Sequence, residues 1–334
     1  MRERCEIVQL GQQGEPSVMV TLVRVKGSSH RQSGARLLFC LGGKYAGTIS
    51  GGCLEAEILR KAPWLVRNGA VVKRYSTLFD DSAEVLFGLG CGGVIDLLFE
   101  PAGSSECQAL LSALGSTLAG EERIVLTQLP AAGQRMARAV LDSEGNLLFV
   151  SEGCSDTAVR YAKECAVRDI ETLSEEFFVE RLGVPQRLFL LGAGDDAKPL
   201  VNMAASMGWN VTVMDGRAQL ARAERFPSAH RVAVISAAST SALEIQGDDA
   251  IVLMTHSYEQ DRDLLAALLP RRPKYLGLLG ACHRSSLLIA ETAARLGCAI
   301  KDCCEQVSAP VGLDLGGEGP ETREQENCCD LCRS

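Results

Sequence analysis

The sequence has few of the features that mark membrane, secreted or nucleic-acid-binding proteins. None of its apolar runs approaches the roughly 20 residues that a transmembrane helix requires. The first residues, Met1 to Glu6, lack the apolar centre of a signal peptide. The chain has 34 basic and 42 acidic residues, a formal net charge of −8, and no basic block. We therefore expect a mildly acidic cytoplasmic protein with no membrane span and no nucleic-acid partner.

The sequence also lacks a complete zinc-type motif, although it contains 14 cysteines. Cys329 and Cys332 form a C-x-x-C pair without a second pair, which is a weak metal signal. The other cysteines are spread through a long chain without a signal peptide, so reduced thiols are expected. Internal repeats are absent from the sequence, and residues 317–334 are predicted to be a polar, Cys-rich tail.

The 334 residues are more than one typical domain needs and predict two domains, each with its own core. Residues 1–170 read as an α+β domain, and residues 187–316 as a second domain of regular α/β alternation. The polar segment 171–186, which contains Gly183 and Pro185, is predicted to be the linker.

Strands and helices of the first domain are predicted from β-branched runs, apolar periodicity and glycine turns. The predicted strands cover 18–25, 35–41, 45–49, 71–75, 94–99, 123–129, 136–141 and 147–150, and the helices cover 54–68, 104–119 and 155–165.

In the second domain strands alternate with helices, a pattern typical of a doubly wound parallel sheet. The predicted strands cover 187–191, 210–214, 231–235, 250–255 and 275–279, and the helices cover 197–207, 259–269 and 284–296. Gly192 and Gly194 form a G-x-G-x-x-A turn with Ala197, and Asp215 ends the second strand. This context predicts a Rossmann fold.

The first domain contains the clearest candidate site, the stretch from Ser50 through Gly51, Gly52 and Cys53 to Glu55. Two glycines allow close approach of a ligand, and a helix N-terminus attracts anions and lowers the pKa of a cysteine. A plain turn with a buried cysteine is the alternative. A second loop carries Gly90, Cys91, Gly92 and Gly93, and we expect both thiols to face one ligand.

Nucleotide binding by the second domain is a weaker hypothesis. Asp195 and Asp196 lie where a pyrophosphate would bind, and they are predicted instead to cap the helix. Asp215 suits either a ribose diol or an ordinary turn. Thr255 and His256 follow the fourth strand at the ligand-binding edge, where His256 is an acid, a base, a phosphate contact or a capping residue.

Several motifs together resemble the XdhC/CoxI family, the accessory proteins of xanthine dehydrogenase, carbon monoxide dehydrogenase and related molybdenum hydroxylases. The resemblance covers about residues 17–316. It rests on Gly27-Ser-Ser-x-Arg31-x-x-Gly34-Ala-Arg36, Gly47-Thr-Ile-Ser-Gly-Gly-Cys-Leu-Glu55, Gly88-Leu-Gly-Cys-Gly-Gly93, the Gly192 turn, Thr255-His256, Leu276-Gly-Leu-Leu-Gly280 and Gly312-Leu-Asp-Leu-Gly316.

The resemblance implies a chaperone without turnover of its own. It would transiently bind the molybdenum cofactor, as molybdopterin or its cytosine dinucleotide form, and protect it while a cysteine desulfurase installs the sulfido ligand. It would then deliver the cofactor to a molybdenum hydroxylase client, and such proteins are usually dimers or larger. The binding residues implied are Arg36, Ser50, Gly51, Gly52, Cys53, Glu55, Gly90, Cys91, Gly92, Gly93, Gly192, Gly194, Asp215, Thr255 and His256.

Cys53 and Cys91 are the candidate metal ligands, because thiolates are soft ligands and good nucleophiles. They would shield the metal, ligate it transiently or relay sulfur. Beyond Gly316 the chain departs from the family pattern, since its polar residues replace an amphipathic helix. Two alternatives stay open, an NAD(P)-dependent oxidoreductase that uses the Gly192 turn and a scaffold that docks the desulfurase onto the hydroxylase.

Overall fold

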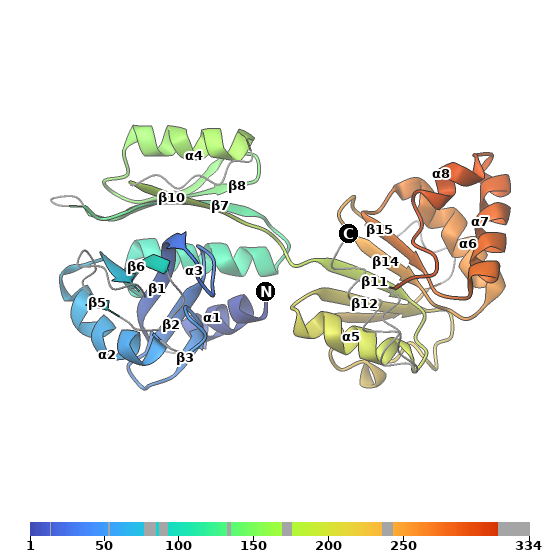
Figure 1. Cartoon of the computed structure of the whole chain (residues 1–334), viewed down its shortest axis with the longest axis horizontal. Helices are drawn as coiled ribbons and strands as arrows, with labels where there is room; N and C mark the ends of the chain where they lie inside the picture. Colours follow the sequence, from blue (N-terminus) through green and yellow to red (C-terminus); the bar gives the residue numbers. More distant parts are fainter. Residues whose placement is uncertain are drawn as a thin grey trace. The chain divides into compact units, whose positions relative to one another are not determined.

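The computed structural model describes residues 1–13, 15–52, 54–76, 85–86, 93–131, 135–168, 176–235 and 243–312. The chain divides into two compact units, Arg2–Val184 and the residues from Pro185 onward (Figure 1). The helices in the described ranges are all too short or too polar to cross a lipid bilayer.

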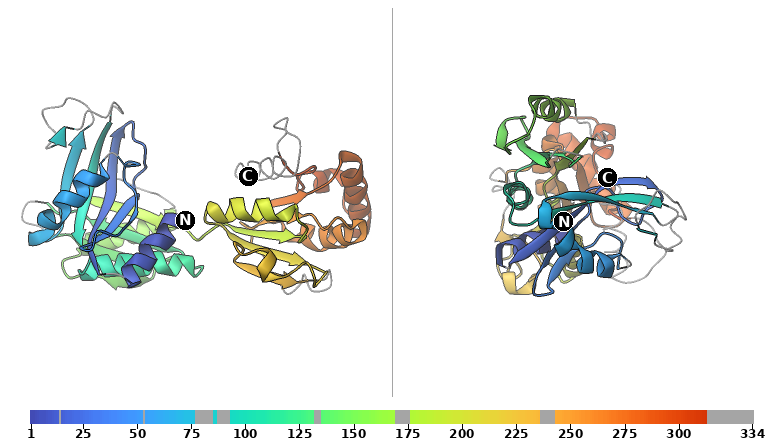
Figure 2. Two further views of the ribbon diagram at one scale, coloured as in Figure 1. Left: turned by 90° about the horizontal axis from the view of Figure 1, so that it is seen from below. Right: turned by 90° about the vertical axis from the view of Figure 1, so that its left-hand side faces the viewer.

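The N-terminal unit contains a six-stranded sheet with strand order β3-β2-β1-β6-β4-β5 (Figures 1 and 2). Its pairs are antiparallel except β4 with β5. The elements are α1 (Arg2–Gln13), β1 (Pro16–Gly27), β2 (Arg36–Cys40), β3 (Tyr45–Gly47), α2 (Glu55–Leu65), β4 (Val71–Ser76), β5 (Val85–Leu86), β6 (Gly93–Pro101) and α3 (Ser105–Leu118).

Side chains of β1 alternate between the two faces of this sheet, as the period of a strand requires. Val18 and Val20 pack with α2 in one core, and Met19 packs with α1 and α3 in another. The predicted helix after Ser50 is confirmed, and a short 3₁₀ turn, Val66–Asn68, ends it before Gly69.

A second sheet of the same unit has strand order β10-β7-β8-β9 and is antiparallel throughout. Helix α4 covers one of its faces (Figure 1). On the other face Val125 and Val140 share a core with α1, α3 and the first sheet. The elements are β7 (Arg123–Gln128), β8 (Ala137–Asp142), β9 (Leu147–Val150), α4 (Asp156–Arg168) and β10 (Phe177–Leu182).

Two buried ion pairs connect these sheets, and each sheet supplies one arginine and one glutamate. Arg138 of β8 donates to Glu100 of β6 over 2.8 Å, and the exposed fractions of the two side chains are 1% and 0%. Arg36 of β2 pairs with Glu180 of β10. Because a buried charge without a partner is costly, these crossed pairs fix one sheet on the other.

The linker prediction is wrong for residues 177–182, because β10 is a full member of the second sheet. Phe178, Val179 and Leu182 are buried there. The polar residues of this segment suggested a linker, but Glu180 is buried against Arg36, a partner 144 positions away in the sequence. Predicted linker residues 169–175 lie outside the described ranges.

The C-terminal unit confirms the predicted Rossmann-type architecture. Its five parallel strands have the order β13-β12-β11-β14-β15. Helix α5 lies on one face of this sheet, and α6 and α7 lie on the other (Figure 1). Leu188 and Leu190 of β11 share a core with α5, whereas Phe189 and Leu191 share a core with α6 and α7. The elements are β11 (Arg187–Leu191), α5 (Ala197–Ser206), β12 (Asn210–Asp215), β13 (Arg231–Val234), β14 (Ala250–Leu253), α6 (Tyr258–Leu268), β15 (Tyr275–Leu278), α7 (Cys282–Leu296) and α8 (Ile300–Cys304).

Candidate functional site

Both glycine-cysteine motifs of the first domain are attached to the same end of the six-stranded sheet. Gly27, the last residue of β1, is paired with Gly93, the first residue of β6. Strand β3 ends at Gly47 beside the start of β2, and β4 ends at Ser76 beside the start of β6. The connections that contain the predicted site residues therefore leave or enter the sheet at this one end.

The carboxylate of Glu55 organises the turn that precedes α2. It accepts hydrogen bonds from the N–H groups of Ile49 (2.9 Å), Ser50 (2.7 Å) and Gly52 (2.8 Å). It also accepts one from the Ser50 hydroxyl at 2.6 Å. Burial alone would raise the pKa of Glu55, but the hydrogen bonds from Ser50 and Ile49 outweigh burial and lower it to about 2. Glu55 is therefore a carboxylate at neutral pH.

This geometry changes the expected role of the turn. The N–H groups of Ser50 and Gly52 were expected to bind a ligand anion, but they donate to Glu55. Gly51 and Gly52 have φ values of 80° and 118°, which L side chains rarely adopt, so both positions require glycine. The anion at this helix N-terminus is thus the protein's own side chain.

The two described neighbours of Cys53 are both hydrogen-bonded within the turn. Gly52 donates to Glu55, and the N–H of Leu54 donates to the Ser50 hydroxyl at 2.8 Å. The predicted site residues Cys53, Gly90, Cys91 and Gly92 lie outside the described residues.

The loop after β1 contacts both the turn and the start of β6. A Cβ atom on Gly51 would lie 3.0 Å from the ring of His30, and one on Gly93 would lie 2.0 Å from the carbonyl oxygen of Ser28. His30 is exposed to solvent. The imidazole beside the turn is thus a polar group that could contact a bound ligand.

Arg36, one of the predicted binding residues, is buried between the two sheets. Its guanidinium pairs with Glu180 and donates to the carbonyl oxygen of Gly34 at 2.8 Å. The positive charge of this predicted binding residue is therefore neutralised by a carboxylate of the second sheet.

In the second unit, Asp215 holds the glycine turn against the end of β12. Its buried carboxylate accepts the N–H of Ala193 at 2.8 Å and two hydrogen bonds from the Arg217 guanidinium, at 2.9 and 2.8 Å. Burial alone would raise the pKa of Asp215, but the hydrogen bonds from Arg217 and Ala193 outweigh burial and lower it. The carboxylate therefore already has partners where a ribose diol would be expected.

A second internal pair joins Asp196, at the start of α5, to His256, which lies between β14 and α6. The imidazole Nε2 lies 2.6 Å from the Asp196 carboxylate, and His256 has a φ of 61°. Asp195 pairs with Lys198 at 2.7 Å and with Arg225 at 2.8 Å. Asp196 is the N-cap residue of α5, as predicted, but its side chain makes no capping hydrogen bond and pairs with His256 instead.

Glycine is required for steric reasons at the first position of the G-x-G motif, where the neighbouring atoms belong to the backbone, whereas the neighbour of the second glycine is the end of a side chain. A Cβ atom on Gly192, which has a φ of 135°, would lie 2.1 Å from the carbonyl oxygen of Met254. One on Gly194 would lie 2.3 Å from the Asp196 carboxylate. The first glycine thus permits close packing of the turn on the end of β14.

Thr255 is buried, and its hydroxyl forms hydrogen bonds with residues at the start of α6. Its hydroxyl donates to Asp261 at 2.7 Å and accepts the N–H of Ser257 at 3.2 Å. Asp261, which was not predicted from the sequence to have a special role, also pairs with Arg284 at 2.6 Å. An acidic residue in the first turn of a predicted helix was the available signal.

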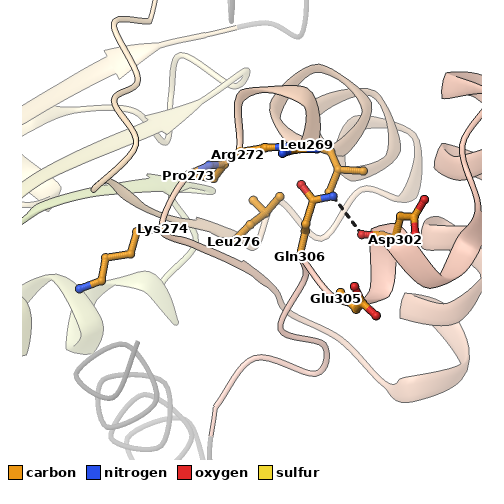
Figure 3. Close-up of a pocket in the computed structure, with 8 residues that line it drawn as sticks. All are labelled: Leu269, Arg272, Pro273, Lys274, Leu276, Asp302, Glu305 and Gln306. Carbon is orange, nitrogen blue, oxygen red and sulfur yellow. Dashed lines mark hydrogen bonds between the residues drawn. The ribbon is translucent and has the colours of Figure 1, made fainter.

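The second unit also has an open depression of about 450 Å³, whose lining is drawn in Figure 3. It is lined by Leu269, Arg272, Pro273, Lys274, Leu276, Asp302, Glu305 and Gln306. Arg272 and Lys274 precede β15, whereas Gly192 and Asp215 follow or end their strands. The depression therefore lies at the amino-terminal ends of the parallel strands, whereas the glycine turn lies at their carboxyl-terminal ends.

In the described ranges, His, Cys, Asp and Glu side chains do not form a three-ligand metal cluster.

Comparison with known proteins identifies the family of both units. A model described as the XdhC and CoxI family matches residues 10–76, and the XdhC Rossmann domain matches residues 188–322. Together these matches cover more than half of the chain. The chain belongs to the XdhC and CoxI family.

Relatives within the XdhC and CoxI family match most of the chain. A protein of Bacillus subtilis (strain 168), named as a probable xanthine dehydrogenase component, is 27% identical over 317 residues, 92% of this chain and 89% of that protein. The molybdenum cofactor insertion chaperone PaoD of Escherichia coli (strain K12) is 27% identical over 300 residues, 90% of this chain and 77% of that protein.

A solved structure shows the same fold over both units. The crystal structure of a xanthine dehydrogenase from Bacillus halodurans matches with a TM-score of 0.83 and 27% identity. The match covers 100% of this chain and 95% of that chain. The XdhC fold thus includes the N-terminal α+β unit and the Rossmann unit.

Proposed function

We propose that this protein is a molybdenum cofactor chaperone that protects the cofactor during sulfuration and helps insert it into a xanthine dehydrogenase-type molybdenum hydroxylase. The observation that carries the proposal is the match to an insertion chaperone over 90% of the chain, which includes both units. A second relative is named as a component of a probable xanthine dehydrogenase. The cofactor is the cargo in this proposal, and the protein performs no turnover of its own.

The cargo has a soft end and an anionic end, and each requires different partners. Its molybdenum and dithiolene sulfurs suit thiolates, and we assign Cys53 and Cys91 to this end. The support from the structure is the turn held by Glu55, which fixes the residues on both sides of position 53. The Glu55 carboxylate and the Ser50 hydroxyl thus hold the two residues that flank position 53 in the chain.

The anionic end, a phosphate or a cytidine-linked pyrophosphate, needs cationic or N–H donors. The N–H groups of Ser50 and Gly52 donate to Glu55, so other groups must serve the cargo. His30 lies beside Gly51, is exposed to solvent, and is our candidate donor from the described loop.

We assign no dinucleotide role to the Gly192 turn. The N–H of Ala193 donates to Asp215, and Asp196, at the start of α5, is paired with His256. A pyrophosphate in the usual pose would meet two carboxylates there. Titration with NADH, followed by nicotinamide fluorescence, should therefore show no saturable binding, and micromolar affinity would favour the oxidoreductase alternative.

Retention of the cofactor tests the chaperone function directly. The protein is incubated anaerobically with molybdenum cofactor, separated by gel filtration and analysed for molybdenum, which should elute with the protein. Cys53→Ala and Cys91→Ala should lower the retained molybdenum. Cys282→Ala, which changes an exposed thiol of the second unit, is the matched control and should retain the wild-type amount.

The partners are tested in the same preparation. We propose a homodimer that contacts both a cysteine desulfurase and the hydroxylase client. Light scattering gives the oligomeric state, and pull-down with each purified partner tests the contacts. Binding of both partners without any retained molybdenum would favour the scaffold alternative and refute the chaperone proposal.

A further inference from the structure

Two thiols lie against each other where α7 meets α8, in a region outside the proposed cargo site. The Sγ atoms of Cys298 and Cys303 are 3.2 Å apart. Cys298 is exposed to solvent, whereas Cys303 is 1% exposed and belongs to the core beneath α6 and α7. One thiol of the pair is therefore accessible and the other is covered.

The local backbone holds the pair in place. Gly297, with a left-handed φ of 69°, ends α7, and the N–H of Cys298 donates to the carbonyl oxygen of Ala293 at 3.1 Å. Ala299 is the N-cap of α8, which contains Cys303. Formation of an S–S bond of about 2.05 Å requires the two sulfurs to approach by about 1 Å, a small movement for side chains that are already in contact.

The two thiols differ in reactivity. Burial and the neighbouring Cys298 raise the pKa of Cys303 to about 11, so its sulfur is protonated at neutral pH. The nucleophile in thiol–disulfide exchange is the thiolate, and access to the oxidant is also required. Cys298 is thus the first thiol to react, and Cys303 is the resolving thiol.

We propose that Cys298 and Cys303 form a redox-active dithiol that low-molecular-weight disulfides convert to an intramolecular disulfide. The Cys298 thiolate attacks one sulfur of the disulfide RSSR, which forms a mixed disulfide and releases one RS⁻. Cys303 then gives its proton to the released RS⁻, and its sulfur attacks the Cys298 sulfur and displaces the second RS⁻, which takes a proton from solvent. The two cysteines lose two electrons and two protons, and RSSR is reduced to two RSH molecules.

The disulfide would fix α8 and the segment that follows it. Ser308 donates to the carbonyl oxygen of Leu276 and accepts the N–H of Leu278, both at 2.9 Å, so this segment runs along β15. Asp302 and Glu305 also lie on one side of the open depression (Figure 3). Oxidation would therefore restrict the movement of α8 and of the segment that pairs with β15, the last strand in the order of the Rossmann sheet. The proposed cargo site is not involved.

Peptide mapping of the full chain tests the dithiol. The protein is incubated with oxidised glutathione, quenched with N-ethylmaleimide and digested with trypsin without reduction. Trypsin cleaves after Lys301, between the two cysteines, so the disulfide joins peptide 296–301 to peptide 302–323. The tail cysteines fall in a separate peptide, 324–333. The joined pair should be the main oxidised form of Cys298.

Two variants decide which thiols react. Cys298→Ser replaces an exposed residue and should abolish the joined peptides, whereas Cys304→Ser should leave them unchanged. Cys282 is exposed and should form a mixed disulfide with glutathione in the same samples. The proposal is overturned if Cys282 is glutathionylated while the joined peptides are absent, or if Cys304→Ser removes them.

Discussion

Replacement of Glu55 by glutamine should destabilise the N-terminal unit by a measurable amount at neutral pH. The carboxylate accepts three backbone N–H groups and one hydroxyl, and its exposed fraction is 6%. A glutamine amide keeps one oxygen but presents an NH₂ group to donors that need an acceptor. The variant therefore leaves hydrogen-bond donors of the turn without partners.

The pKa of Glu55 sets the scale of this effect. A pKa of about 2 in place of 4.5 corresponds to at most about 3 kcal/mol of stability at neutral pH. Because the turn lies near the surface, solvent screening reduces this contribution, and we expect about 2 kcal/mol for Glu55→Gln. In a unit of this size such a loss lowers Tm by about 4–8 °C.

The sign of the pH dependence follows from the lowered pKa. The unfolded chain binds a proton at Glu55 more readily than the folded chain does, so the carboxylate stabilises the fold above pH 4.5. This contribution is lost as pH falls from 4.5 toward 2. Wild type and Glu55→Gln should therefore differ most at pH 7 and converge over this acidic range.

Urea unfolding followed by tryptophan fluorescence is the suitable assay. The chain has two tryptophans, Trp64 on α2 and Trp209 in the second unit, so a Trp209→Phe background reports on the N-terminal unit. Glu57→Gln is the matched control, since Glu57 lies in the same helical turn and pairs with Arg60. Equal stability of the Glu55 and Glu57 variants at pH 7 would refute the role assigned to Glu55.

Two further predictions concern buried features of each unit. Arg138→Met should cost about 3–5 kcal/mol, because Glu100 is left buried without its partner. The double variant with Glu100→Leu should recover much of this loss in urea unfolding, and an equally unstable double variant would contradict it. Gly192→Ala should lower the free energy of unfolding by more than about 1 kcal/mol, because position 192 has a positive φ and the added Cβ atom would clash with the carbonyl oxygen of Met254. Gly247→Ala, which has open space, should change stability by less than about 0.5 kcal/mol in thermal unfolding, and equal effects would contradict the steric argument.

Local patterns in the sequence predicted most of the strands and helices. The β-branched run of β1 and the alternation of the second unit gave elements close to those in the structure. Helix α1 (Arg2–Gln13) was not predicted, because its sequence is mostly polar and only Ile7 and Val8 of the helix are buried. Strand β10 was assigned to the linker, because its polar residues have partners on another sheet.

Of the candidate site, the structure confirms only the prediction of a turn before a helix. The helix that begins at Glu55 was predicted from the apolar pattern, but the direction of its carboxylate was not. The hydrogen bonds join residues only three to six positions apart, yet they depend on backbone angles that glycine permits and does not specify. The structure was needed to show that the turn binds its own carboxylate.

The sequence by itself determined the two-domain organisation, the Rossmann turn and the family motifs, because these depend on local periodicity and on glycine at fixed spacing. The tertiary structure decided which charges have partners. The partners of Arg36 and Asp196 lie far away in the chain, so their ion pairs could not be predicted from the sequence. Cys303 lies only five positions after Cys298, but the contact between their sulfur atoms was also seen only in the structure. Electrostatic and thiol contacts depend on distances of a few ångströms, and folding sets those distances between side chains that the sequence places far apart or on different elements.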